Sequence, residues 1–122
     1  MTTNTGHTSA IRASKVIGTT VKDSAGQKLG EVKDVVLDKQ SNSILFGVMS
    51  FGGVLGMGEK YYPVPWSVLD YNPDKGGYVV PMSKSTLEKA PAYSIDDLTK
   101  NDGQFGDIRQ QSYTYYNVKR DW

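Results

Sequence analysis

The most informative segment of the chain is Leu29-Gly30-Glu31-Val32-Lys33-Asp34-Val35-Val36-Leu37. Apolar and charged residues alternate at its start, as in a half-buried β-strand, and three apolar residues then follow in a row. Side chains two positions apart share one face of a strand, so Val32 and Val35 cannot both face the core of a regular strand. A β-bulge near Lys33-Asp34 would place both valines in the core. We predict a bulge there, with Asp34 turned inward to hydrogen-bond backbone groups.

The sequence on both sides of this segment predicts further short strands separated by turns rich in Gly, Asn, Asp and Ser. The expected strands cover residues 16–21, 29–39, 44–51, 60–66, 68–71 and 77–82. Pro63 and Pro65 remove two hydrogen-bond donors from the fourth of these, which favours an edge strand or the end of a strand, with Trp66 largely buried at its end. The residues expected to have structural roles are Gly18, Gly26, Gly30, Asp34, Gly52, Gly53, Gly56, Pro65 and Trp66.

The strand Ile44–Phe51 is apolar on both faces. One face can enter the core, but the other must be covered by a helix, by the C-terminal tail or by a second subunit. This strand and the aromatic tail are the basis on which we expect a homodimer. The candidate partner or dimer contacts are Leu45, Met49, Phe51, Leu55, Met57, Tyr113, Tyr115, Tyr116 and Trp122.

The pattern changes after residue 82, where short helical turns are expected. Ser85-Thr86-Leu87-Glu88 fits a capping box, and Pro91 would end that helix. A second helical turn is predicted over 94–100. The remaining tail is polar but rich in aromatic residues, which suit either a clamp on the barrel or a second subunit, or a tail that docks on an external partner.

Composition excludes much chemistry. The 122 residues include no cysteine, so disulfides, zinc ribbons, thiol nucleophiles and cysteine-held iron–sulfur clusters are excluded. The single histidine, His7, lies in a leader expected to be disordered, which argues against histidine-based catalysis. The net charge of +1 argues against direct binding of nucleic acid. We see no signal peptide and no membrane span, and expect a cytoplasmic protein without a cofactor.

Two further motifs have the residue types of known binding sites. The glycine loop 52–58 has the spacing of a phosphate loop, but Glu59 stands where a carboxylate would repel phosphate, which favours an ordinary hairpin loop. Leu55 and Met57 are then apolar tips that can bind a partner. Glu31, Asp34 and Asp38 alternate with lysines along one strand, so a solvated face is favoured over a site for a hard cation.

Ordered motifs over residues 12–92 resemble the PRC-barrel family. The motifs are Ala13-Ser14-Lys15-Val16-Ile17-Gly18, Val21 with Asp23 and Gly26, Leu29 to Val35, the glycines of 52–58, and Pro63-Val64-Pro65-Trp66. The family is named after the cytoplasmic domain of the reaction-centre H subunit of purple bacteria, and includes the C-terminal domain of the ribosome maturation factor RimM. Ala90-Pro91-Ala92-Tyr93 and the tyrosine-rich end are similar to its stand-alone bacterial members.

The resemblance implies an all-β fold, a small barrel of about six strands, followed by the short helical turns and the aromatic C-terminal tail. The expected organisation is a leader over 1–11, the barrel over 12–92 and an extension over 93–122 that packs on the barrel or a partner. The implied function is a non-catalytic adaptor that binds protein partners, and we expect it to be homodimeric. The alternative is an accessory factor in ribosome maturation or RNA metabolism that acts through a ribosomal protein.

Overall fold

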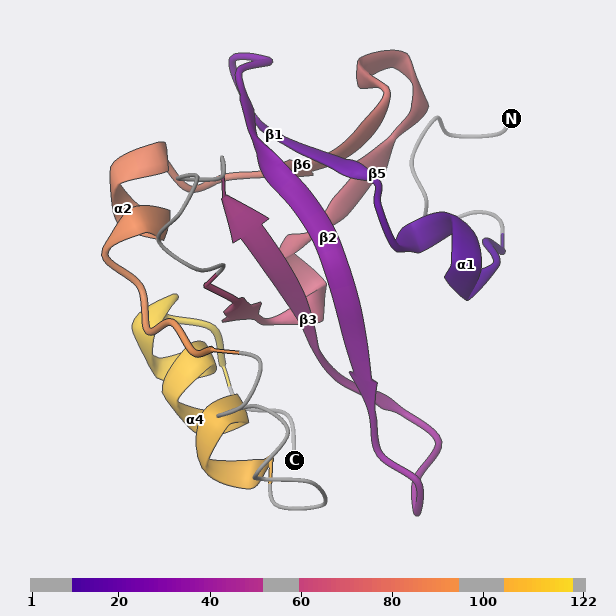
Figure 1. The fold of residues 1–122 in the computed structure, drawn as a ribbon, viewed down its shortest axis with the longest axis vertical. Coiled ribbons are helices and arrows are strands. Elements are labelled where there is room, and N and C mark those ends of the chain that lie inside the picture. Colours follow the sequence, from indigo (N-terminus) through magenta and orange to yellow (C-terminus); the bar gives the residue numbers. More distant parts are fainter. Residues whose placement is uncertain (1–9, 52–59, 95–104, 120–122) are drawn as a thin grey trace.

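The computed structural model of the chain describes residues 10–51, 60–94 and 105–119. It is a mostly β structure with one six-stranded sheet in the order β4-β3-β2-β1-β6-β5 (Figure 1). The strands are β1 (Thr20–Asp23), β2 (Lys28–Leu37), β3 (Ile44–Phe51), β4 (Tyr62–Val64), β5 (Asp70–Asn72) and β6 (Gly77–Val80). Neighbouring strands are antiparallel, except that β1 and β6 are parallel. Among the described residues the sheet is not closed, so the expected barrel is open between its edge strands.

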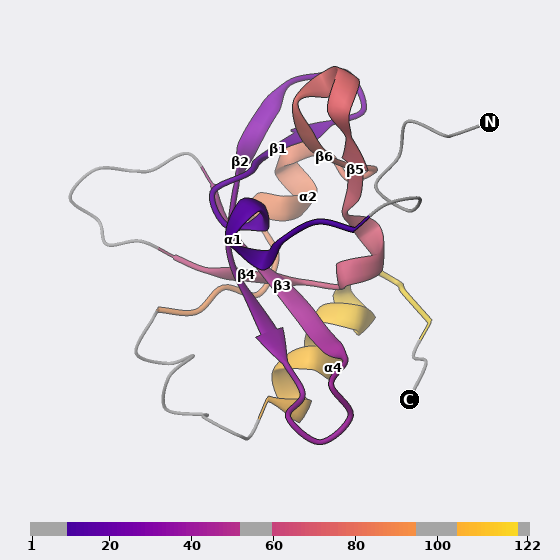
Figure 2. The ribbon, with the colours of Figure 1, turned by 90° about the vertical axis from the view of Figure 1, so that its right-hand side faces the viewer.

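Few helical elements surround the sheet. They are α1 (Ala13–Val16), the 3-10 turns η2 (Trp66–Val68) and η3 (Pro73–Lys75), α2 (Lys84–Glu88) and α4 (Gly106–Tyr115). Figure 1 shows β2 and β3 side by side as the longest strands, with α4 on one side of the pair and α1 on the other. Figure 2 shows the same ribbon turned by 90°, and in both views α4 and the turn that joins β2 to β3 lie in the lower half of the picture.

The predicted β-bulge is confirmed. Val32 pairs with Met49 and Asp34 pairs with Val48, so Lys33 is the extra residue of β2. Val32 is fully buried and Val35 packs against the same core, as the bulge prediction required. The inward orientation predicted for Asp34 is wrong, because its side chain is exposed. The carboxylate does bind a backbone group, since its Oδ1 accepts a hydrogen bond from the N–H of the adjacent Val35 at 2.8 Å.

The two faces of β3 enter two separate hydrophobic clusters. Met49 belongs to the main core, together with Val32 and the buried residues of β1, β4 and β6. Phe46 and Val48 point to the opposite face, where they pack with Ile108 of α4. Ser112 of α4 donates a hydrogen bond from its hydroxyl to the carbonyl of Pro63 in β4 at 3.1 Å. The sequence left a helix, the C-terminal tail or a second subunit as possible covers for this face. In the structure the face is covered by α4, a helix of the chain's own C-terminal segment.

Turn residues behave as their chemistry requires. The Asp23 carboxylate accepts hydrogen bonds from the N–H groups of Ala25 and Gln27, and Gly26 has a φ of 88°. The Asp38 carboxylate closes the β2–β3 turn in a similar way by accepting from the Gln40 N–H and the Ser41 hydroxyl. These local bonds hold the hairpins in register. The edge position predicted for the proline-containing strand is confirmed by β4.

Three local predictions need correction. The first strand begins at Thr20 and not at Val16, because α1 and the positive φ of Gly18 (90°) precede it. The N-cap of α2 is Ser83, whose hydroxyl accepts from the Thr86 N–H at 3.2 Å, and not Ser85. Trp66 begins η2 and is only partly buried, because the chain turns there instead of continuing as a strand. The helical turn predicted over 94–100 lies almost entirely outside the described residues.

Helix α4 was not predicted. Its C-terminus is well defined: Asn117 has a φ of 56°, and the N–H groups of Asn117 and Val118 donate to the carbonyls of Thr114 and Tyr113 at 3.1 and 2.9 Å. This is the hydrogen-bond pattern of a Schellman motif, in which a left-handed residue ends a helix. The tail therefore contains a properly terminated helix where an irregular aromatic segment was expected.

Candidate functional site

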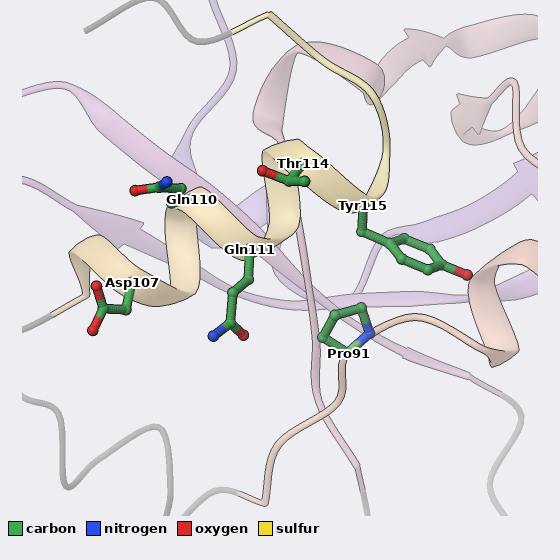
Figure 3. Close-up of a pocket in the computed structure, with 6 residues that line it drawn as sticks. All are labelled: Pro91, Asp107, Gln110, Gln111, Thr114 and Tyr115. Atoms are coloured by element: carbon green, nitrogen blue, oxygen red, sulfur yellow. The ribbon is translucent and has the colours of Figure 1, made fainter.

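The candidate site lies around α4, where two cavities border different faces of the helix. The outer groove has a volume of about 540 Å³ and is lined by Pro91, Asp107, Gln110, Gln111, Thr114 and Tyr115. Figure 3 shows Gln111, Tyr115 and Pro91 around the groove, with Tyr115 extending from the end of α4. The hairpin cavity, on another face, has a volume of about 470 Å³ and is lined by Asp38, Ser41, Ser43, Ile44, Trp66, Ser67, Arg109 and Tyr113.

The outer groove is held by hydrogen bonds between α4 and the segment before it. The Tyr115 hydroxyl donates to the carbonyl of Thr86 at 2.6 Å, and the Tyr93 hydroxyl donates to Oε1 of Gln111. Burial raises the pKa of the Tyr93 phenol above its ordinary value, so this donor keeps its proton at neutral pH. Tyr93 is also bridged to Tyr61 by backbone hydrogen bonds of 2.8 and 2.9 Å in both directions. These hydrogen bonds connect α4 to the segments that border the groove.

The hairpin cavity is formed by three parts of the chain that are far apart in the sequence: the β2–β3 turn, η2 and α4. The Arg109 guanidinium lies over the ring of Tyr113, 5.5 Å from its centre. Hydrogen bonds from the Gln40 N–H and the Ser41 hydroxyl, with a smaller contribution from Arg109, lower the pKa of the Asp38 carboxyl. Asp38 is therefore ionised at neutral pH, and the cavity carries one fixed charge of each sign.

The predicted contact residues divide by exposure. Tyr115 is 37 % exposed and borders the outer groove. Met49 is fully buried in the main core and Tyr113 is 6 % exposed, so neither presents a surface large enough to anchor a partner. Leu45, Phe51 and Tyr116 are partly buried against the two clusters. Leu55, Met57 and Trp122 lie outside the described residues.

Several predicted structural residues have clear local roles. Gly18 and Gly26 have positive φ values of 90° and 88°. Gly30 lies against the backbone of Ser50 so closely that a Cβ atom would overlap its carbonyl group. Pro65 is buried. Gly52, Gly53 and Gly56 fall in 52–59, outside the described residues.

Most of the groove residues were missed by sequence reasoning. Asp107, Gln110, Gln111 and Thr114 follow an i, i+3, i+4, i+7 spacing, which places them on one face of a helix. Polar residues at this spacing give no hydrophobic signal, so the sequence does not mark this face. Ile108 and Ser112, one turn apart, both contact the sheet from α4, and of these two only Ile108 is apolar.

The acidic residues of β2 and Asp38, which follows it, have local partners. Glu31 forms an ion pair with Lys33 at 2.9 Å, while Asp34 and Asp38 accept backbone hydrogen bonds. Within 10–51, 60–94 and 105–119, no three His, Asp or Glu residues gather as metal ligands would. None of the helices in these same ranges has the length and apolar character needed to cross a bilayer.

The fold and the grooves define a small, mostly β domain with recessed surfaces of aromatic, amide and hydroxyl side chains, which is consistent with an interaction module. The chain belongs to the PRC-barrel family, since the model of the PRC-barrel domain matches residues 9–87. A search of curated proteins returned no significant match. Helix α4 begins after the matched region, so the hairpin cavity combines parts of the family domain with a segment that follows it, whereas the residues that line the outer groove all follow the matched region.

Proposed function

We propose that the protein is a non-catalytic adaptor that binds protein partners, and that it associates with a second copy of itself. The observation that supports this is the outer groove, where an exposed tyrosine stands beside a proline and two glutamines. Tyrosine is enriched in protein interfaces, and glutamine side chains can both donate to and accept from a peptide backbone. Membership of the PRC-barrel family, which is generally non-catalytic, supports an interaction role over an enzymatic one.

The contact surface that we propose differs from the one expected from the sequence. The second apolar face of β3 is occupied by α4 within the chain, so it is not open to a second subunit. The outward face of α4 remains exposed at Asp107, Gln110, Gln111 and Thr114. Self-association would therefore use the outer groove, with Tyr115 as its aromatic anchor.

Light scattering during size-exclusion chromatography tests the dimer. We expect a mass of twice the chain's 13.4 kDa at micromolar concentration. Thr114→Glu places a charge in the groove without removing any hydrogen bond made by the wild-type side chain in the described structure, and should return the protein to a monomer. Ser24→Glu, in the exposed β1–β2 turn, is the matched control and should remain dimeric.

A wild-type mass of 13.4 kDa across the concentration range would reject self-association. The adaptor role is then tested by affinity capture from the native cell with wild type and Thr114→Glu in parallel. A partner that is retained by wild type and lost with Thr114→Glu supports the role, and a ribosomal protein among such partners would identify the ribosome-linked alternative. Identical capture by both proteins would reject the groove as the binding surface.

A further inference from the structure

The hairpin cavity has features that the adaptor role does not use. It lies between the β2–β3 turn, η2 and α4, and its volume of about 470 Å³ falls within the range of small-ligand sites. Its lining differs from that of the outer groove, because it combines an arginine, three serines and two large aromatic rings. The two cavities lie on different faces of α4, so an inference about one does not depend on the other.

One wall of the cavity is apolar and rigid. Trp66 packs edge-to-face on the ring of Tyr78, with ring centres 5.7 Å apart, and Tyr78 is itself buried in the core. The space behind Trp66 is filled by β3, where a Cβ atom on Gly47 would come within 3.2 Å of Cε3 of the indole. Ile44 adds an aliphatic surface beside this ring. Because the indole is held from behind, it offers a fixed flat surface to a ligand.

The opposite side of the cavity is cationic. Arg109 projects from α4, its Nε is buried, and its guanidinium lies over the ring of Tyr113, one helical turn further along. The planar fork of a guanidinium suits bidentate binding of a carboxylate. The hydroxyls of Ser41, Ser43 and Ser67 border the same space and can donate to an anion.

Asp38 limits where an anionic ligand can bind in the hairpin cavity. Its side chain lies on the β2–β3 turn, where its oxygens are already engaged by the Gln40 N–H and the Ser41 hydroxyl. These donors lower the pKa of the Asp38 carboxyl, so the group is negatively charged at neutral pH and repels an anion at the cavity, although the donors offset part of its charge. A carboxylate should therefore bind at Arg109 and away from the turn.

We propose that the hairpin cavity is a binding site for a carboxylate attached to an aromatic or aliphatic group. The carboxylate binds Arg109, and the apolar group lies on Trp66 and Ile44. This chemistry occurs in free aryl and alkyl acids, and also in an acidic side chain next to an aromatic residue in a peptide. Because α4 supplies Arg109, the site exists only while α4 is docked on the sheet.

Titration of the full chain with phenylacetate, followed by amide and indole NMR signals, tests the site. Shifts are expected at Trp66, Ser67, Ile44 and Arg109, and phenylacetamide, which has the same shape without the charge, should bind at least about tenfold more weakly. An absence of shifts at millimolar phenylacetate, or equal binding of the amide, would overturn the proposal.

Variants separate the roles of the two charges. Arg109→Gln should weaken phenylacetate binding at least about tenfold, and Arg109→Lys, which keeps the charge but not the planar fork, should fall between it and wild type. Asp38→Asn keeps an oxygen that can accept from the Gln40 N–H and removes the repulsion, so it should strengthen binding. Arg12→Gln removes a surface charge near α1 and should change nothing.

Unfolding curves of each variant show whether the fold is retained. If a folded Arg109→Gln protein binds phenylacetate as wild type does, or if Asp38→Asn weakens binding, the assignment is wrong. The source of the ligand is decided by comparing phenylacetate with acetyl-Asp-Phe-amide and its acetyl-Asn-Phe-amide control. Tighter, carboxylate-dependent binding of the peptide identifies a protein ligand, and tighter binding of phenylacetate identifies a free acid.

Discussion

At the scale of single residues, Gly30 shows how closely β2 and β3 approach each other. Gly30 of β2 pairs with Phe51 of β3. A Cβ atom at position 30 would overlap the backbone carbonyl of Ser50, which precedes Phe51 in β3. The obstacle is backbone, which cannot rotate away as the end of a side chain can. Both strands would have to shift, and these strands form the longest pairing in the sheet.

Gly30→Ala is therefore expected to lower the free energy of unfolding by about 3 kcal/mol or more, as overpacking in a dense core does. Gly26→Ala is the control, because a Cβ at that turn meets nothing within 4 Å and only the φ of 88° is strained. Its expected cost is about 1 kcal/mol. Urea denaturation of the two variants gives the comparison, and equal stabilities would show that β2 and β3 can separate at Gly30 without penalty.

Tyr116 gives the protein a dependence on alkaline pH. Its hydroxyl is buried without a hydrogen-bond partner among the described residues, and burial, followed by the nearby Tyr115 and Tyr62, raises the pKa of its phenol above the ordinary value of 10.0. The folded state therefore holds this proton more tightly than the unfolded state. The contribution to stability is complete below a pH of about 10 and is lost as pH rises above it.

Tyr116→Phe should reduce this loss. We expect wild type to lose free energy of unfolding between pH 9 and about 11, and the variant to lose less over the same interval. At neutral pH the variant should be as stable as wild type or more stable, since a buried hydroxyl without a partner carries a desolvation cost. Urea unfolding at both pH values measures the difference, and identical pH dependence of the two proteins would mean that the phenol is solvated.

At the scale of elements, the docking of α4 depends on few apolar side chains. Ile108 is 5 % exposed and packs with Phe46 and Val48 of β3. Ile108→Ala should cost about 2–5 kcal/mol in the region where α4 contacts the sheet. Because this region is only part of the structure, amide hydrogen exchange should show α4 opening before β2 and β3 do.

Gln110→Ala is the matched control, because Gln110 lies two residues after Ile108, on the exposed face of the same helix. It is expected to change the stability of the fold by less than about 0.5 kcal/mol. If Ile108→Ala had as little effect on exchange in α4, the second hydrophobic cluster would not be what holds the helix.

The sequence predicted the sheet better than the helices because turns and strands carry local signals. The bulge near Lys33 could be predicted because Val32 and Val35 must share the core face of one strand. The turn at Asp23 and Gly26 could be predicted because an aspartate accepts hydrogen bonds from nearby backbone N–H groups and a glycine adopts positive φ. Helix α4 lacks such a signal, since Ile108 is its one fully apolar buried anchor and its tyrosines favour strands in isolation. The local sign of its end in the sequence is Asn117, because asparagine tolerates the left-handed conformation that ends the helix there.

The candidate site was harder to predict for the same reason. Tyr115 was predicted as a contact residue because it belongs to the aromatic tail, but Gln110, Gln111 and Pro91 come together with it only because α4 folds and docks. Met49 was chosen from a strand that is apolar on both faces, and the sequence did not show which face α4 would cover. Both outcomes depend on packing between segments that are far apart in the sequence. The residue pattern of a single segment gives no information about such packing.

At the scale of the whole molecule, the C-terminal segment should be needed for a stable domain. A chain that ends after Tyr93 loses the Ile108 contact and the hydrogen bonds from Ser112 to Pro63 and from Tyr115 to Thr86. Phe46 and Val48, which are 0 % and 1 % exposed in the full structure, would then lose this cover. We expect lower stability in urea, binding of a hydrophobic dye, and self-association of the shortened chain.

Adding a peptide of residues 94–122 to the shortened chain should reverse the dye binding, and the same peptide with Ile108→Ala should not. Unchanged stability after truncation would show that α4 contributes little to the domain. Dye binding that the wild-type peptide cannot reverse would mean that the exposed surface is not the face of β3.

The parallel pairing of β1 with β6 has a consequence for the order of folding. Val21 of β1 lies beside Tyr78 of β6. The first and the last strand in the sequence are therefore neighbours in the sheet, although most of the sheet's residues lie between them in the chain. The β2–β3 hairpin needs only a short loop to close, whereas β1 and β6 must bring distant segments together, which is entropically costly and slow. On the ribosome, β1 emerges early but its parallel edge stays unpaired until β6 has been synthesised. During that interval, an unfinished sheet edge is exposed to other chains.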